Sequence, residues 1–159
     1  MDKGYDSSDD EEYLFKPSEI IPGKLYLSCC SIAGKEDLMK IYGITGIISM
    51  GGFSDHVVYT IHKDPMKYLF VFIDDHENEP IDEHFEECIQ FIKTMDGPVL
   101  VHCMAGISRS STIVIAYLMK EKGMGMGDAY DYVKERRSIV RPNSGFRRRL
   151  REYELSLKK

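Results

Sequence analysis

Apolar residues along the chain follow two different periods, and the shorter period predicts strands. Five short runs are rich in β-branched and aromatic residues and are bounded by glycine, proline or polar clusters, as strands usually are. Near-continuous apolar runs such as residues 44–50 and 98–102 are typical of strands buried on both faces of a sheet. The predicted strands are residues 24–28, 44–50, 56–62, 67–73 and 98–102.

The longer period, with apolar residues three or four positions apart, predicts helices. In residues 81–95 the apolar positions Phe85, Cys88, Ile89 and Ile92 share one helix face. Strands and helices alternate at first and helices dominate the end. This order predicts an α/β fold with a central, mostly parallel sheet of about five strands flanked by helices. The predicted helices are residues 35–42, 81–95, 110–122, 128–137 and 144–157.

Composition divides the chain into a short acidic tail and one folded domain. The 159 residues suit a single domain with one core. Residues 1–12 hold six acids, one base and few apolar side chains. We therefore predict that residues 1–17 form a disordered tail and residues 18–159 form the domain. Ser7 and Ser8 each have an acid three residues on, which suits an acid-directed kinase.

The pattern contains no sign of a membrane segment or a secretory signal. No apolar run approaches the roughly 20 residues that a membrane helix needs, and the first residues lack the apolar stretch of a signal peptide. We therefore expect a soluble protein of the cytoplasm, the nucleus or both.

The four cysteines lack the spacing of a zinc site, so we expect free thiols and no bound metal. Three of them are expected to be small apolar side chains of the core, with redox pairing to the fourth, Cys103, as the alternative. These three are Cys29, Cys30 and Cys88.

Charge is concentrated at the two ends of the chain. Residues 134–159 hold ten bases and three acids, whereas the net charge of the whole chain is −5. A basic end of this kind can bind nucleic acid or another anionic partner, or it can be a solvated helix face beside an anion site. No aromatic-rich strand pattern of an RNA-binding domain accompanies it, so we expect no nucleic-acid partner.

The chemically informative stretch is residues 102–110, which read HCMAGISRS. A buried strand leads to Cys103, and six residues later Arg109 stands at the start of a helix. If the loop curls around its own centre, its backbone N–H groups and the helix N-terminus form an anion cradle. Gly106 supplies a position where a positive φ is tolerated, and Arg109 can clamp two phosphate oxygens at once.

The same cradle would activate Cys103 as a nucleophile. A thiol that faces inward N–H groups and a positive helix end ionises readily. A thiolate beside a bound phosphate can attack phosphorus and form a phosphocysteine, while the loop amides and Arg109 stabilise the equatorial oxygens of the transition state. The simpler alternative is a strand, turn and helix in which Cys103 is a core residue. The combination of His102, Gly106 and Ser110 around the Cys and Arg argues against that alternative.

This stretch resembles the HCxxGxSRS active-site loop of dual-specificity protein phosphatases, within the HCxxGxxR group of protein tyrosine phosphatases. The resemblance extends to residues 116–119 (AYLM) and 141–146 (RPNSGF), covers about residues 18–157, and fits the small atypical members. It implies a phosphatase that acts on phosphotyrosine and on phosphoserine or phosphothreonine in phosphorylated proteins. It also implies no metal or organic cofactor, and it leaves the oligomeric state open.

The resemblance implies a role for each residue of the loop. Cys103 would be the nucleophile and Arg109 the phosphate clamp, and Ser110 would hydrogen-bond the thiolate and help it leave. His102 and Asn143 would support the loop, His102 also by favouring the thiolate. The phosphate-binding loop would comprise Met104, Ala105, Gly106, Ile107, Ser108 and Arg109.

The family takes its general acid from a loop upstream of the cysteine strand, which here is residues 73–81. In similar sequences the acid lies six residues before the apolar residue that opens the next helix. Counting back from Ile81 gives Asp75. The adjacent Asp74 stays a candidate.

Two other functions stay open. The same mechanism could act on a non-protein phosphate such as an inositol lipid or an RNA 5′-phosphate, but the uncharged residues 104–108 favour a protein substrate. A degenerate relative could instead bind phosphoproteins without turnover, although Cys103 and Arg109 are both present. Arg137 and Arg141 are candidates for contacting a second acidic or phosphorylated residue of the substrate.

Overall fold

A five-stranded sheet forms the centre of the molecule. The computed structural model describes residues 11–56 and 59–159. The strand order is β1-β2-β5-β3-β4, with β1 antiparallel to β2 and the other neighbours parallel, which confirms the predicted mostly parallel sheet. The strands are β1 (Ser18–Ile21), β2 (Leu25–Ser28), β3 (Gly46–Gly51), β4 (Lys67–Phe72) and β5 (Val99–His102).

One predicted strand is wrong. Within residues 56–62, the described residues form no strand, and residues 57–58 lie outside the description. His56 adopts a left-handed conformation (φ 54°), and the Tyr59 hydroxyl turns inward to donate to the Met50 carbonyl at 3.0 Å. The fifth strand is instead β1, whose four residues are too few to show an alternation in the sequence.

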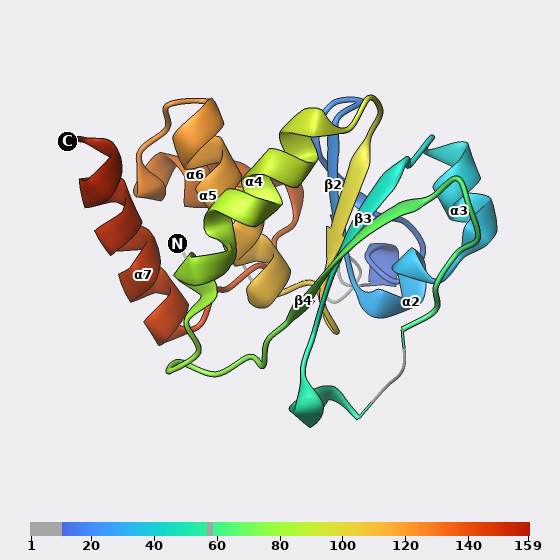
Figure 1. Cartoon of the computed structure of the whole chain (residues 1–159), viewed down its shortest axis with the longest axis horizontal. Helices are drawn as coiled ribbons and strands as arrows, with labels where there is room; N and C mark the ends of the chain where they lie inside the picture. The colour runs from blue at the N-terminus through green and yellow to red at the C-terminus, as the bar shows by residue number, and fades with distance from the viewer. Residues whose placement is uncertain (1–10, 57–58) are drawn as a thin grey trace.

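Helices cover both faces of the sheet, as Figure 1 shows: α4 to α7 lie on one side, and the short α2 and α3 on the other. Every residue from Arg109 to Met119 of α5 is buried, because this helix lies between the sheet and its neighbours α6 and α7. A helix that is buried all round belongs to the core. The helices are α2 (Cys30–Ala33), α3 (Glu36–Ile41), α4 (Phe85–Thr94), α5 (Arg109–Glu121), α6 (Met126–Arg136) and α7 (Ser144–Leu157), with 3-10 turns η1 (Phe53–Asp55) and η2 (Ile81–His84).

The segment before β1 contacts the domain. The Tyr13 hydroxyl accepts a hydrogen bond from the Ser138 amide at 2.8 Å, and the Arg137 guanidinium lies 4.8 Å from the Tyr13 ring centroid. Residues 1–10 of the predicted tail, including Ser7 and Ser8, lie outside the described residues. Among the helices of residues 11–56 and 59–159, none is long and apolar enough to cross a membrane.

Candidate active site

The candidate nucleophile lies where the central strand ends. β5 is paired on both sides, by β2 and β3, and all four of its residues are buried. The chain leaves β5 at Cys103 and enters α5 at Arg109, so the two predicted catalytic residues lie on either side of the five-residue turn 104–108. Both side chains are buried, with exposed fractions of 2% and 4%. The carboxyl ends of parallel strands are where α/β folds place their ligands.

The carbonyl groups of this loop are all bonded on its outer side. The Met104 carbonyl accepts from the Cys30 amide at 3.0 Å, and the Ile107 carbonyl accepts from the Arg141 amide at 2.8 Å. The two carbonyls between them, of Ala105 and Gly106, accept from the Arg137 side chain at 3.1 and 2.8 Å. Because successive carbonyls point outward, the intervening N–H groups are left to face the loop centre, where they can receive an anion.

Gly106 and Arg137 make this curled loop possible. Gly106 has a φ of +67°, and a Cβ added to it would lie 2.6 Å from Arg137 Nη2 and 2.6 Å from the Ser28 carbonyl. Arg137 is fully buried beneath the loop, and its Nη1 also donates to Ser18 Oγ at 3.1 Å. Our prediction that Arg137 contacts the substrate is therefore wrong, since its side chain is used inside the domain. Arg141 is exposed and stays a candidate.

Ser110 lies next to the thiol. Its Oγ is 3.1 Å from Cys103 Sγ, and it is fully buried in the first turn of α5. A hydroxyl in this place can donate a hydrogen bond to a thiolate. The partial positive charge at the N-terminus of the 13-residue α5 favours a negative charge at the same point.

The His102 imidazole is neutral and buried, and both of its ring nitrogens are hydrogen-bonded. Burial lowers the pKa of its imidazole to about 4, so the ring carries a single N–H at neutral pH. Nδ1 lies 3.0 Å from the Cys103 carbonyl, which can only accept, so Nδ1 holds the proton. Nε2 then accepts from the Ser49 hydroxyl at 2.7 Å. His102 thus ties the start of the loop to β3, and as a neutral ring it adds no charge near the thiol.

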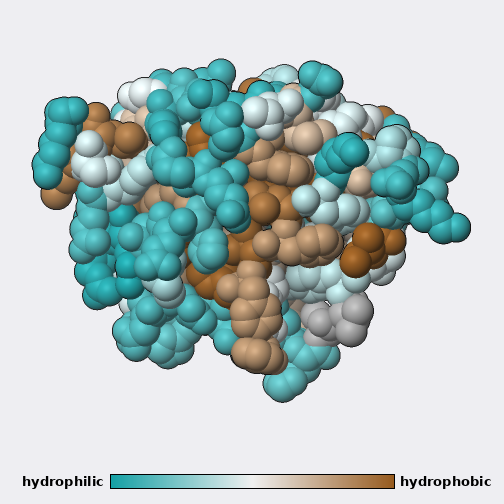
Figure 2. All heavy atoms as spheres, in the orientation of Figure 1, coloured by the Kyte–Doolittle hydropathy of each residue, from teal (hydrophilic) through white to brown (hydrophobic). Residues whose placement is uncertain are grey.

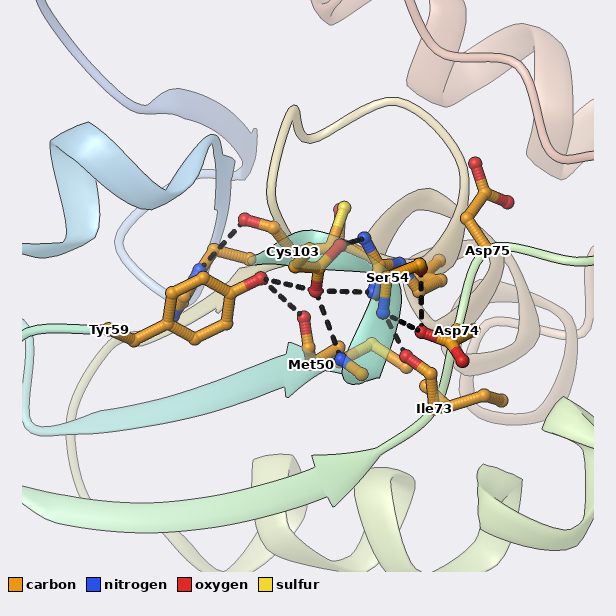
Figure 3. A network of polar contacts seen from close by, with 12 residues as sticks. Met50, Ser54, Tyr59, Ile73, Asp74, Asp75 and Cys103 are labelled. Carbon is orange, nitrogen blue, oxygen red and sulfur yellow. Dashed lines mark hydrogen bonds and ion pairs between the residues drawn. The ribbon is translucent and has the colours of Figure 1, made fainter. Parts of the chain in front are cut away.

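Arg109 is held by an acid that the sequence analysis did not find. Arg109 Nη1 and Nη2 donate to the two carboxylate oxygens of Asp55 at 2.8 and 2.7 Å, and Nη1 also donates to the Ile73 carbonyl at 2.9 Å. Burial acts to raise the pKa of Asp55, but hydrogen bonds from Arg109 and from the Gly52 amide outweigh it and hold that pKa below its usual value. Tyr59 donates to the same carboxylate at 3.1 Å. Figure 3 shows this network from close by, with Tyr59, Ile73 and Cys103 among its labelled residues.

One edge of the Arg109 guanidinium is available to bind a ligand. Arginine has five N–H donors in a planar fork, and Asp55 and Ile73 take three of them. Within the part of the chain that the structure describes, Arg109 Nε is buried without a hydrogen-bond partner. The remaining donors are Nε–H and the outer N–H of Nη2, which are parallel and suited to two oxygens of one phosphate. An unsatisfied buried donor of this kind indicates an anion-binding site.

Asp74 and Asp75 have different surroundings. Asp74 Oδ1 accepts from both the amide and the hydroxyl of Ser54, at 3.0 and 2.7 Å, and these bonds lower the pKa of Asp74. Asp75 is exposed and accepts one hydrogen bond, from Asn143 Nδ2 at 2.9 Å. In Figure 3 the Asp75 carboxyl points away from the network that binds Asp74.

Asn143 connects the acid loop to the phosphate loop. Its backbone N–H donates to Ser108 Oγ at 3.0 Å. Its side-chain oxygen caps α7 by accepting from the Phe146 backbone N–H at 2.9 Å. Nearby, a Cβ on Gly145 would lie 1.8 Å from the Glu77 carbonyl, so only glycine lets the acid loop pass this close to α7. The segment 141–146 therefore positions Asp75 as well as the loop.

The other three cysteines are free thiols. Cys88 is fully buried in α4 and burial raises its pKa to about 12, so it is an apolar core residue. Cys29 is buried beside Ser31 and Cys30 is half-buried.

Comparison with known proteins places this site in a family. A family model described as dual specificity phosphatase, catalytic domain, matches residues 25–156. The chain therefore belongs to the dual specificity phosphatase family of catalytic domains.

Among curated relatives, dual specificity protein phosphatase 1 of Arabidopsis thaliana is 39% identical over 144 residues, which is 89% of this chain and 70% of that protein. Human dual specificity protein phosphatase 5 is 40% identical over 87% of this chain, but the chain spans only 35% of its length. A probable rhodanese domain-containing dual specificity protein phosphatase of Dictyostelium discoideum is 42% identical over 89% of this chain, which spans 29% of it.

Solved structures share the whole architecture. The human tyrosine phosphatase-like serine/threonine/tyrosine-interacting protein superposes with a TM-score of 0.84 at 38% identity, covering 91% of this chain and 99% of that one. DUSP15 superposes with a TM-score of 0.78 at 36% identity, covering 90% and 95%. These neighbours confirm the predicted fold class.

Proposed function

We propose that this chain hydrolyses phosphotyrosine and phosphoserine or phosphothreonine in proteins through a phosphocysteine intermediate. One observation carries the proposal. The buried Arg109 presents an unpartnered Nε–H edge at the end of the loop that begins with the Cys103 thiol. An anion bound on that edge and on the loop amides would carry its phosphorus to the thiolate, and the family of catalytic domains to which the chain belongs supports this use.

The reaction has two steps. In the first, the Cys103 thiolate attacks phosphorus, the bond from phosphorus to the substrate oxygen breaks, and Asp75 gives that oxygen its proton. In the second, water attacks the phosphocysteine and gives a proton to the Asp75 carboxylate, and the sulfur–phosphorus bond breaks. Ser110 donates its hydroxyl hydrogen bond to the sulfur as it leaves as a thiolate, and inorganic phosphate is released.

Charge in the loop favours a simple phosphate monoester. Residues 104–108 carry no charged side chain, so within the loop Arg109 alone supplies a formal positive charge to the phosphate. Inositol polyphosphates and RNA 5′-triphosphates carry more negative charge than one guanidinium can balance. A single phosphorylated side chain fits this site better.

A binding function without turnover is the second candidate, because the structural neighbour at 38% identity is named a phosphatase-like interacting protein. The contact of Cys103 Sγ with Ser110 Oγ supports turnover, because a hydroxyl in this place can stabilise the thiolate as it leaves phosphorus. Turnover requires a reduced Cys103 thiol, so we propose a reducing compartment, the cytoplasm or the nucleus.

The test is kcat/KM on matched phosphotyrosine and phosphothreonine peptides, with an inositol phosphate beside them and vanadate as inhibitor. Turnover of both peptides, blocked by vanadate, is the expected result. Turnover of the inositol phosphate alone would overturn the substrate class. Binding of both peptides without turnover would establish the second candidate in place of the first.

Replacing Asp55 with Asn should lower kcat/KM for a phosphopeptide by about 10- to 100-fold, because Arg109 loses the carboxylate that aims its fork. The same change removes the charge of a buried ion pair, so the free energy of unfolding should fall by about 3 kcal/mol. Enzyme assays and urea unfolding measure the two effects.

A double-mutant cycle separates positioning from folding. In an Arg109→Lys background there is no fork left to aim, so Asp55→Asn should change kcat/KM by less than about threefold. Equal effects of Asp55→Asn in both backgrounds would mean that Asp55 only stabilises the fold.

A further inference from the structure

Large apolar side chains are exposed beside the candidate active site. Phe53 is 80% exposed, Phe72 64%, Ile61 62% and Phe70 56%. We call these four residues the β4 patch. Figure 2 shows apolar residues gathered down the middle of this face, over the region of β4 and η1 in Figure 1. The largest apolar patch on a soluble monomer typically measures several hundred Å² and is often an interaction site.

The patch exists because the helices leave part of the sheet uncovered. β4 is one of the two edge strands, and its side chains alternate between the two faces of the sheet. Val71 is buried on the side of α4, whereas Phe70 and Phe72 point to the opposite face. On that face the small cluster beneath α2 and α3 reaches Tyr68 and stops there. Among the described residues, neither the Phe70 nor the Phe72 ring enters a core: Phe70 stacks on Tyr68 with the ring centroids 5.2 Å apart, and both rings stay exposed.

The patch is continuous with the catalytic network. Phe53 belongs to η1, whose next two residues bind the acid loop and Arg109: Ser54 contacts Asp74, and Asp55 contacts Arg109. Phe72 immediately precedes Ile73, whose carbonyl accepts from Arg109. The Phe53 and Phe72 rings pack edge to face with their centroids 4.6 Å apart.

A hollow opens within the patch. It has a volume of about 320 Å³, which is enough for an apolar side chain and is near the lower limit for small-ligand pockets. Ile61, Phe70 and Phe72 form its apolar wall, and Asp55 and Tyr59 of the arginine network lie in its lining. A side chain in this hollow would therefore touch the residues that position Arg109.

We infer that the β4 patch binds apolar side chains that flank the phosphorylated residue of the protein substrate. This inference rests on the proposed function, and it adds a substrate preference that the phosphate loop cannot provide. A peptide whose phosphate lies on Arg109 would extend across η1 and the end of β4, because these segments border the arginine. Aromatic residues supply large contact areas at low entropic cost, which suits such a docking site.

Size favours a substrate over a second copy of the chain. At these exposed fractions the four side chains together expose an apolar surface on the order of 500 Å². This area is smaller than the roughly 800 Å² per partner that a stable interface buries. A short apolar segment of a transiently bound substrate fits an area of this size.

The test uses two phosphotyrosine peptides that differ only beside the phosphoresidue, one with Leu, Ile and Phe within four positions on either side and one with Ser and Gly there. The chain should prefer the apolar peptide by at least about tenfold in kcat/KM. The double variant Phe70→Thr and Phe72→Thr should lose that preference and keep its turnover of p-nitrophenyl phosphate, which is too small to reach the patch. The control Leu155→Ser on α7, an equally exposed apolar residue, should keep the preference.

Equal kcat/KM for the two peptides, or a preference that survives the double variant, would overturn the inference. Sedimentation velocity and flotation with phosphatidylserine vesicles test the other occupants. Dimer formation or vesicle binding by the unsubstituted chain that the double variant loses would overturn the inference as well. Phe53→Ser is a second variant for the case in which the double variant has a lowered melting temperature.

The proposed function and the inference fail separately. If the chain turns over neither p-nitrophenyl phosphate nor the peptides, the proposed function is wrong. Fluorescence anisotropy with the same two peptides then tests the patch by binding alone, and equal affinities would overturn it.

Discussion

Replacing Cys103 with Ser should abolish phosphopeptide turnover, by at least roughly 10⁴-fold in kcat, while phosphopeptide affinity changes by less than about fivefold. The serine hydroxyl is a far weaker nucleophile than a thiolate. Among the described residues, the adjacent His102 is not placed to deprotonate it, because its ring is bonded to Ser49 and to the Cys103 carbonyl. Binding should persist because the outward-bonded carbonyls of the loop and the free edge of Arg109 do not depend on the sulfur. Stopped assays with radiolabelled phosphopeptide and fluorescence anisotropy measure the two quantities.

The matched control is Cys30→Ser, which makes the same chemical change at a half-buried cysteine. The backbone N–H of Cys30 supports the loop by donating to the Met104 carbonyl. It should leave kcat within about twofold. A Cys103→Ser protein that retains appreciable turnover would remove Cys103 as nucleophile, and a control that also loses turnover would show that the loop tolerates no change nearby.

The part of the site that could be predicted from the sequence is the part built from contiguous residues. Cys103, Gly106, Arg109 and Ser110 lie within one strand, turn and helix, so their spacing alone places them around one point. The structure brings these side chains together through local geometry, with a positive φ at Gly106 and a 3.1 Å contact between the sulfur and the Ser110 hydroxyl.

Asp55 and Arg137 were not predicted as parts of the loop, because their partners are distant in sequence. Asp55 meets Arg109 across 54 residues, and Arg137 meets Gly106 across 31. Asp55 is one of many acids and follows two glycines, a sequence that is equally typical of a solvated turn. The only signal was chemical: a buried arginine that uses one edge for phosphate needs acceptors for its other N–H groups, and here a carboxylate and the Ile73 carbonyl supply them.

The errors in the fold have the same origin. Residues 56–62 are β-rich by composition, but the inward bonds of Tyr59 to Met50 and Asp55 use that segment to build the arginine network. β1 was missed because a four-residue strand depends on its pairing with β2 more than on its own sequence.

Replacing Asp75 with Asn should lower kcat for a phosphoserine peptide by roughly 10²- to 10⁴-fold, the range that a general acid contributes. The amide can still accept the hydrogen bond from Asn143 Nδ2, so the loop stays in place and only the transferable proton is lost. The fall should be much smaller with p-nitrophenyl phosphate, because a nitrophenolate leaves without protonation. Steady-state kinetics on both substrates measure the difference.

Asp74→Asn is the matched control for the general acid, one residue away in the same loop. The Asp74 carboxylate accepts two hydrogen bonds from Ser54, which lower its pKa and so disfavour the protonated form that a general acid needs. Its replacement should lower kcat by less than about tenfold and by the same factor for both substrates. The reason is that the change only loosens the acid loop, whatever the leaving group. The reverse ranking, with the leaving-group dependence appearing in Asp74→Asn, would move the acid to Asp74 and would require the Ser54 hydrogen bonds to break when substrate binds.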